Sequence, residues 1–158
     1  METGHTTGEE TDRDAAVLVL GGGGALRIGR SLGRRGTAVD VMSRGIPPAQ
    51  IRHSRYIDRV FPVPGGCDMD GFFAAVRRRL AADRYDLVIP LGDQDLVRPA
   101  SKRKDGLSDY APVAVESPGT HGTVWDKGRT VSAARRADVP IPDTCQVSDV
   151  ADLQEIDL

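Results

Sequence analysis

The sequence predicts a doubly wound α/β domain, in which helices cover both faces of an open parallel sheet. Three strand-like runs separated by helical segments support this prediction: Val17 to Leu20, Thr37 to Met42 and Tyr85 to Leu91. Short runs rich in Val, Leu and Ile are typical of strands that are buried on both faces. Strands that alternate with helices across short connections indicate parallel βαβ units. The 158 residues suffice for one such domain and part of another.

The first strand and helix meet at a run of glycines. After Leu20 come Gly21, Gly22, Gly23 and Gly24, which permit a sharp turn or the close approach of a ligand. In the helix that follows, the spacing of the residues places small and apolar side chains on one face and arginines on the other. Leu26, Gly29, Leu32 and Gly33 are expected to pack on the sheet. Arg27, Arg30, Arg34 and Arg35 are expected to point outward.

The same glycines raise the alternative of an NAD(P)-binding oxidoreductase domain. Gly21 and Gly23 match the first two glycines of the dinucleotide fingerprint, and Asp40 follows about 20 residues later, where a ribose-binding carboxylate is expected. However, Leu26 stands in place of the third glycine. Asp40 also lies in the middle of the predicted second strand instead of at its carboxyl end. A structural turn is therefore favoured over a nicotinamide or flavin site.

Later elements follow the same alternation. Arg59 to Val63 is predicted as a third strand, and Asp68 or Asp70 as the cap of the next helix, whose apolar residues recur every four positions. Ser101 to Asp105 is expected to be a solvated helical stretch. Ala111 to Val115 is predicted as a fifth strand near a sheet edge, because its proline cannot donate to a ladder.

The loop after the strand Tyr85–Leu91 begins with Gly92 and Asp93. In open parallel sheets, ligands collect outside the carboxyl ends of the strands. We therefore expect the substrate-side cleft at Gly92, Asp93 and the glycine run Gly21 to Gly24. A simple helix cap at the acids of this loop is the alternative.

From Glu116 the character of the chain changes, beginning with a loop-like Ser-Pro-Gly. Thr123 and Asp126 resemble a capping box with Asp in the usual Glu position and predict that one helix starts there. Lys127 then falls in the first turn, where a cation opposes the helix dipole by a few tenths to about 1 kcal/mol. A lysine beside free N–H groups suits a phosphate, and an ordinary surface lysine is the alternative. Thr144 to Val147 is predicted as a strand and Ser148 to Ile156 as a helix.

Composition narrows the classes of function. The net charge is −2 and the arginines stand among acids, so we expect no nucleic-acid partner. Cys67 and Cys145 match no metal or redox spacing, which indicates a reduced, cytoplasmic setting. No run of residues approaches the length of a membrane span, and residues 1–14 are predicted to be a disordered acidic tail.

Two segments carry a resemblance to a known family. The run Trp125 to Thr130, followed by an alanine-rich helix and by Ala137 to Thr144, resembles a segment of ATP-grasp enzymes: Asp-Lys, Thr, a helix, then Gly-Val-Pro-x-Pro-x-Thr. The departure within this pattern is Asp138, where the family usually has glycine. Upstream, Val17–Gly36, the link from Arg52 to Pro64 and Leu87–Asp93 look like the preceding domain of carboxylate-amine ligase-like members.

The resemblance implies a Rossmann-like pre-ATP-grasp domain at residues 15–117, and a linker helix with an incomplete ATP-grasp start at 118–158. It further implies the amino-terminal part of a ligase that joins a carboxylate to an amine through an acyl phosphate, with ATP and Mg²⁺. Lys127 matches a family position that reaches the nucleotide phosphates. The family's later lysine and metal ligands would lie beyond Leu158, so we expect no catalytic or metal-binding residue here and no activity of the chain alone.

The expected partners are small-molecule carboxylate and amine substrates, without nucleic acid or membrane, and a homodimer is left open. The alternative function is a stand-alone module that binds a small ligand or serves as an accessory subunit.

Overall fold

The computed structural model describes residues 15–145, 147 and 149 of the chain. Contacts within the chain divide it after Val115 into two compact units, and each unit is considered by itself. The tail expected at residues 1–14 lies outside the described residues. So does the helix expected from Ser148 to Ile156, apart from Asp149.

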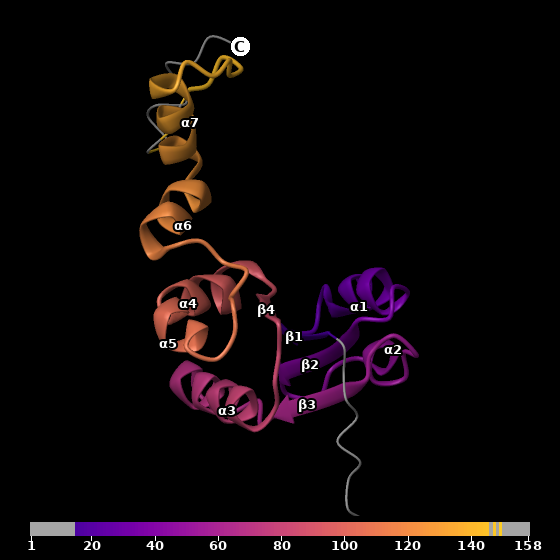
Figure 1. Cartoon of the computed structure of the whole chain (residues 1–158). Coiled ribbons are helices and arrows are strands. Elements are labelled where there is room, and N and C mark those ends of the chain that lie inside the picture. Colours follow the sequence, from indigo (N-terminus) through magenta and orange to yellow (C-terminus); the bar gives the residue numbers. More distant parts are fainter. Residues whose placement is uncertain (1–14, 146, 148, 150–158) are drawn as a thin grey trace, which may run out of the picture. The chain divides into compact units, whose positions relative to one another are not determined.

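Within the described part of the first unit, four parallel strands form one sheet in the order β3-β2-β1-β4 (Figure 1). Their bounds are Ala16–Leu20 for β1, Ala38–Arg44 for β2, Arg59–Val63 for β3 and Leu87–Pro90 for β4. The chain moves outward from β1 through β2 to β3 and then returns to place β4 on the other side of β1. The direction of winding therefore reverses between β1 and β4.

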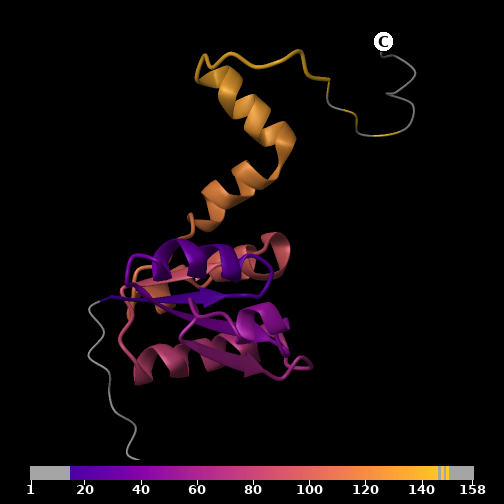
Figure 2. The ribbon, with the colours of Figure 1, turned by 90° about the vertical axis from the view of Figure 1, so that its right-hand side faces the viewer.

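Helices cover both faces of this sheet, so the doubly wound α/β prediction is confirmed. One face carries α1 (Ala25–Gly33) and α2 (Ala49–Arg52). The other carries α3 (Met69–Ala82), α4 (Arg98–Ser101) and α5 (Lys104–Ser108). Helices α1 and α3 lie on opposite sides of the sheet in both views (Figures 1 and 2).

Strand β1 contributes to both apolar cores, because successive side chains of a strand point to opposite faces. Val17 and Val19 face α1 and α2, whereas Leu18 and Leu20 face α3, α4 and α5. All five residues of the strand are buried. An apolar run without polar alternation is the pattern expected of such a doubly covered strand.

The predicted cap of α3 is confirmed, and a glycine of α1 allows a close approach to a neighbouring segment. Asp68 caps α3 by accepting a hydrogen bond from the Gly71 N–H at 2.7 Å. Gly29 lets α1 approach the segment before β3, since a Cβ on Gly29 would collide with Ile57 Cδ1 and would lie 3.0 Å from the Tyr56 carbonyl oxygen.

Two other predictions for this unit need correction. The expected fifth strand at Ala111–Val115 is reduced to a single parallel bridge between Val113 and Val88, because a proline cannot extend the ladder. The helical stretch from Ser101 is not fully solvated: Ser101 is buried, and its hydroxyl donates to the Arg98 carbonyl at 2.9 Å.

The described part of the second unit contains α6 (Pro118–Trp125) and α7 (Lys127–Arg136). The predicted capping box is wrong, because Thr123 lies inside α6. Ser117 caps α6, with its hydroxyl accepting from the Thr120 N–H at 3.3 Å, and Pro118 suits the first helical position. The Ser-Pro-Gly expected as a loop is therefore a helix start.

The strand expected from Thr144 is also wrong for the described residues, since Thr144 and Cys145 have irregular structure. A strand needs a partner to satisfy its backbone groups, and the described part of this unit offers none. Asp138 follows α7 with φ +54°, a left-handed conformation that favours glycine. This position is the one at which the resembled family usually has glycine.

Candidate functional site

The glycine run after β1 and the loop after β4 lie side by side at the carboxyl edge of the sheet. The two strands are hydrogen-bonded neighbours, and the Leu91 N–H donates to the Leu20 carbonyl at 2.9 Å. Gly21 has φ +102°, and a Cβ there would lie 3.1 Å from the Leu91 carbonyl oxygen. A side chain at Gly21 would therefore disturb the junction of the two loops.

Gly92 directs the chain after β4 into a turn of π-helix, η1 (Asp93–Val97). Its φ is +90°, and its carbonyl accepts from the Val97 N–H at 3.1 Å. The structure thus brings Gly92 and the backbone of Asp93 to the same edge as the first glycine run. Sheets of this kind bind ligands where the winding direction reverses, which here is the junction of β1 and β4.

The chemistry at this edge comes from the backbone. Around Gly23, nothing would come within 4 Å of an added Cβ, so the turn is open on that side. Peptide N–H groups in a glycine turn can approach an anionic ligand closely. The arrangement suits binding and positioning of a ligand. The substrate-side role of Gly21 to Gly24, Gly92 and Asp93 stays a prediction.

Lys127 is the first residue of α7, the place in the first turn that the sequence suggested, and it is exposed. Asp126 precedes it as the cap, and its Oδ1 accepts from the Arg129 N–H at 3.1 Å. One of the N–H groups at this helix start is therefore already satisfied by a carboxylate. Binding of a phosphate here would depend on the charge of Lys127 more than on the N–H groups of the helix end. The role of Lys127 in nucleotide binding stays a prediction.

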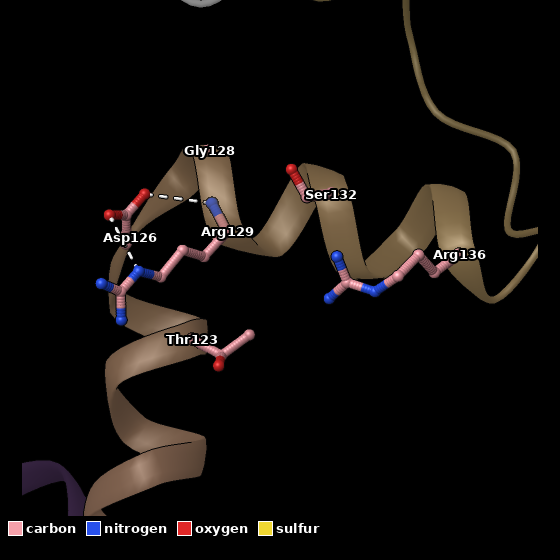
Figure 3. A pocket seen from close by; sticks show the side chains of 6 residues that line it. All are labelled: Thr123, Asp126, Gly128, Arg129, Ser132 and Arg136. Atoms are coloured by element: carbon pink, nitrogen blue, oxygen red, sulfur yellow. Dashed lines mark hydrogen bonds and ion pairs between the residues drawn. The ribbon is translucent and has the colours of Figure 1, made fainter.

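A hollow of about 370 Å³ lies between α6 and α7, and sequence reasoning missed it (Figure 3). Its lining residues are Thr123, Asp126, Gly128, Arg129, Ser132 and Arg136. The Arg129 Nε pairs with Asp126 Oδ2 at 3.6 Å. Arg129, Ser132 and Arg136 stand three, four and seven positions apart, a spacing that places them on one helix face. That spacing was the signal in the sequence from which a polar face of this helix could have been predicted. Lys127 is not among the residues that line the hollow.

The described residues do not fit a resident metal ion. Among them, no three His, Cys, Asp or Glu side chains gather closely enough to hold one. Cys67 and Cys145 are free thiols. The helices in the described ranges also include none that is long and apolar enough to cross a membrane.

Asp40, the carboxylate on which the dinucleotide alternative depended, is fully buried. The Arg59 Nη2 pairs with its Oδ2 at 2.7 Å, and the Tyr85 hydroxyl donates to the same oxygen at 2.7 Å. The hydrogen bond to Asp40 raises the pKa of Arg59, and burial, followed by Asp40, raises the pKa of Tyr85. A ribose outside the sheet cannot reach this carboxylate, so the structure gives the dinucleotide alternative no support.

Comparisons with known proteins find no match among family models or curated proteins. Solved structures do match. An L-amino acid ligase from Bacillus licheniformis superposes with a TM-score of 0.64 at 18% identity over 94% of this chain. The biotin carboxylase domain of a single-chain bacterial carboxylase gives 0.60 at 23% identity over 89%. The N5-carboxyaminoimidazole ribonucleotide synthetase from Thermotoga maritima gives 0.58 at 18% identity over 89%.

This chain spans about a third of each of these proteins: 35%, 33% and 36% of their lengths. The first unit ends at Val115 of 158 residues, so an overlap of 94% must extend into the second unit. Identities this low establish the fold and not the activity. The resemblance noted in the sequence is confirmed at that level: the chain has the fold of the amino-terminal region of ATP-grasp enzymes, with a Rossmann-like first unit.

Proposed function

We propose that this chain is the amino-terminal part of an ATP-dependent ligase that joins a carboxylate to an amine through an acyl phosphate. The observation that carries the proposal is Lys127 at the start of α7, in a chain whose fold overlaps an L-amino acid ligase over 94% of its length. The Asp-Lys pair and the later Pro-x-Pro-x-Thr stand in the order of the resembled family.

In this proposal Lys127 holds the nucleotide phosphates. ATP supplies the phosphoryl group that activates the carboxylate, and Mg²⁺ would neutralise the phosphates. Lys127 contributes a mobile positive charge and up to three N–H donors. The described residues include no set of metal ligands, so no Mg²⁺ contact is assigned to them.

The carboxyl edge of the sheet faces the substrates in this proposal. The turn at Gly21 to Gly24 and the loop at Gly92 and Asp93 would receive the small-molecule carboxylate or amine through backbone groups. Their adjacency at the reversal of winding supports this role. The sheet edge then positions a substrate. The groups that promote phosphorylation of the carboxylate are supplied by the rest of the ligase.

The experiment uses the chain extended by the downstream coding region, if the gene encodes one, and compares Lys127→Ala with Arg135→Ala. Arg135 is an exposed cation on the same helix whose Nη2 donates to the Thr144 carbonyl at 3.3 Å, so it controls for loss of charge. Loss of a charge-assisted contact worth roughly 1.5–3 kcal/mol should weaken ATP binding by about one to two orders of magnitude. The melting temperature should not change. Equal ATP affinities in the two variants would remove Lys127 from the nucleotide site.

The chain of 158 residues by itself is expected to release no ADP with any pair of carboxylate and amine, because positioning and charge neutralisation supply most of phosphoryl-transfer catalysis. Coupled ADP release by this chain alone would contradict the proposal. A stand-alone binding module becomes the better description if the gene encodes no further lysine-bearing strand and no metal-binding carboxylates.

A further inference from the structure

The corner between α6 and α7 holds a concave polar surface that the proposed function does not use. It is the hollow of about 370 Å³ shown in Figure 3, here called the corner hollow. The residues that line it are Thr123, Asp126, Gly128, Arg129, Ser132 and Arg136. Neither helix contains a buried residue, so no apolar core fills this corner.

Hydrogen bonds fix the two helices at the corner. The Thr130 hydroxyl oxygen lies 2.9 Å from the Thr123 carbonyl oxygen in α6 and 3.0 Å from the carbonyl oxygen of Asp126, which joins the helices. The Asp126 carboxylate caps α7 by accepting from the Arg129 N–H at 3.1 Å. The shape of the corner is therefore set before any ligand binds, which reduces the entropy that binding costs.

Positive charge prevails in the corner hollow, because two arginines share it with a single acid. Both carboxylate oxygens of Asp126 are engaged at the start of α7: Oδ1 accepts from the Arg129 N–H, and Oδ2 pairs with the Arg129 Nε at 3.6 Å. Within the part of the chain that the structure describes, the Arg136 guanidinium and the Ser132 hydroxyl have no hydrogen-bond or ion-pair partner. These two groups are available as donors to a ligand.

The geometry of α7 brings the donors together. Arg129, Ser132 and Arg136 share one face of the helix. Side chains of a helix lean toward its amino terminus, and Figure 3 shows the Arg136 guanidinium turned back along α7 toward the part that carries Ser132 and Arg129. Arg135 lies in the same last turn, yet it donates to the Thr144 carbonyl and does not line the hollow. The helix dipole favours both arginines, so it does not account for the placement of Arg136.

Guanidinium and hydroxyl groups are donors that suit phosphoryl and carboxylate oxygens. We propose that the corner hollow binds one phosphoryl or carboxylate group of a small molecule through Arg136, Ser132 and Arg129. Lys127 precedes Arg136 by nine positions, about two and a half turns, so the two side chains leave opposite sides of α7. The corner hollow is therefore an anion site separate from the position proposed for the nucleotide phosphates. It does not depend on the proposed function, and both positions can be filled at the same time.

Other occupants fit the corner hollow less well. A metal ion would meet two arginines and a carboxylate that is already paired with one of them. A second copy of the chain would have to bring an acidic side chain into the corner, and its binding would depend on protein concentration. The test distinguishes that outcome from a small anion.

The test is NMR of the 158-residue protein during titration with inorganic phosphate or with acetate. The arginine Nε–Hε groups and the amides of α7 are followed, with chloride holding the ionic strength constant so that screening does not change. The signals of Arg129 and Arg136 should shift and saturate with at least one of the two anions. The anion that binds more tightly identifies whether a phosphoryl or a carboxylate group is the ligand.

Variants then assign the binding to the corner hollow. Arg136→Gln should weaken the affinity about 5-fold, because it removes a charge-assisted contact at an exposed site. Ser132→Ala should weaken it by a smaller factor. Arg135→Gln is the matched control and should keep the wild-type affinity, since this arginine lies outside the hollow. Glutamine and alanine favour helix, so α7 should form in all three variants, and their circular dichroism should equal that of wild type.

Shifts at Arg129 and Arg136 that fail to saturate with either anion would overturn the proposal. Equal losses of affinity in Arg135→Gln and Arg136→Gln would do the same, because they would indicate a general effect of charge. If Lys127→Ala weakens the binding measured at Arg136, the anion lies at the start of α7, and the inference fails independently of the proposed nucleotide role. An affinity that rises with protein concentration would identify a second copy as the occupant and would also overturn the proposal.

Discussion

Arg59 and Asp40 lie opposite each other on neighbouring strands, and two nitrogens of the guanidinium converge on one buried oxygen. The Arg59 Nε and Nη2 donate to Asp40 Oδ2 at 3.0 and 2.7 Å. The Tyr85 hydroxyl reaches the same oxygen, and the Arg59 Nη1 also pairs with Asp83 at 3.3 Å. This polar cluster ties β2 and β3 to the segment before β4, so its role is structural.

Removing the carboxylate should destabilise the fold strongly. Asp40→Ala would leave Arg59 and Tyr85 without their shared acceptor inside the sheet. Breaking a fully buried pair costs about 3–5 kcal/mol, and because the Arg59 side chain is 35% exposed we expect a smaller loss, about 2–4 kcal/mol. Urea unfolding measures it, with the exposed Asp109→Ala as control within about 0.5 kcal/mol of wild type. A loss below about 1 kcal/mol for Asp40→Ala would show that the cluster contributes little.

Two of the three tyrosines should titrate on opposite sides of the ordinary value. Tyr56 has a lowered pKa through Arg55 and Arg34, whereas burial and then Asp40 raise the pKa of Tyr85. In a spectrophotometric titration of tyrosinate, Tyr56→Phe should remove the earliest step and Tyr85→Phe the last. The reverse assignment would contradict the described environments.

The raised pKa of Tyr85 also has a consequence for stability. The folded pKa exceeds the unfolded value of about 10, so the stability contributed by the neutral phenol is fully present below pH 10 and is lost as the pH rises further. Between pH 10 and 12, unfolding of Tyr85→Phe should therefore depend on pH less steeply than unfolding of the wild type. If the free energy of unfolding depends on pH equally steeply in both proteins, ionisation of Tyr85 is not coupled to stability.

Close packing at Gly29 should make even a methyl group unfavourable. In Gly29→Ala the new Cβ would collide with Ile57 and would lie 3.0 Å from the Tyr56 carbonyl oxygen. Overpacking costs about 1–3 kcal/mol, which outweighs the gain of up to about 1 kcal/mol in helix propensity. Gly106→Ala in α5 is the matched control, since no atom lies within 4 Å of its added Cβ. Thermal unfolding should show a loss for the first and a small gain for the second; equal shifts would contradict the close approach.

At Asp138, in contrast to Gly29, we expect a substitution to stabilise the local structure. Asp138 has φ +54° after the end of α7, and a left-handed conformation costs a non-glycine residue roughly 1 kcal/mol. Asp138→Gly should therefore slow amide exchange in the last turn of α7, because the helix end becomes easier to hold. Asp143→Gly, an exposed change in the segment that follows, should not. Unchanged exchange in Asp138→Gly would mean that the aspartate adopts this conformation without strain.

Local patterns were enough to predict the strands β1 to β4, the helices α1 and α3, and the glycine turn. Each depends on neighbours in sequence: apolar runs define buried strands, and Asp68 caps α3 through the Gly71 N–H only three residues away. The expected capping box at Thr123 failed because two competing local signals, Ser117 with Pro118, start a helix one and a half turns earlier. Lys127 nevertheless lies in the first turn of a helix, as predicted, because Asp126 caps the second helix of this unit, α7.

The sequence by itself determined the doubly wound class, the exposed arginines of α1 and the place of the glycine loops at strand ends. These features depend on the periodicity of strands and helices, which can be recognised from residues that are close together in the sequence. The tertiary structure alone decided the strand order, which places Gly21 beside Leu91 at the reversal of winding. It alone decided that Asp40 meets Arg59 and Tyr85, residues 19 and 45 positions away. It also decided that Ala111–Val115 forms a single bridge and that an open hollow lies between α6 and α7. These features depend on which distant segments become neighbours, and that choice follows from the packing of whole faces, to which no short stretch of sequence corresponds.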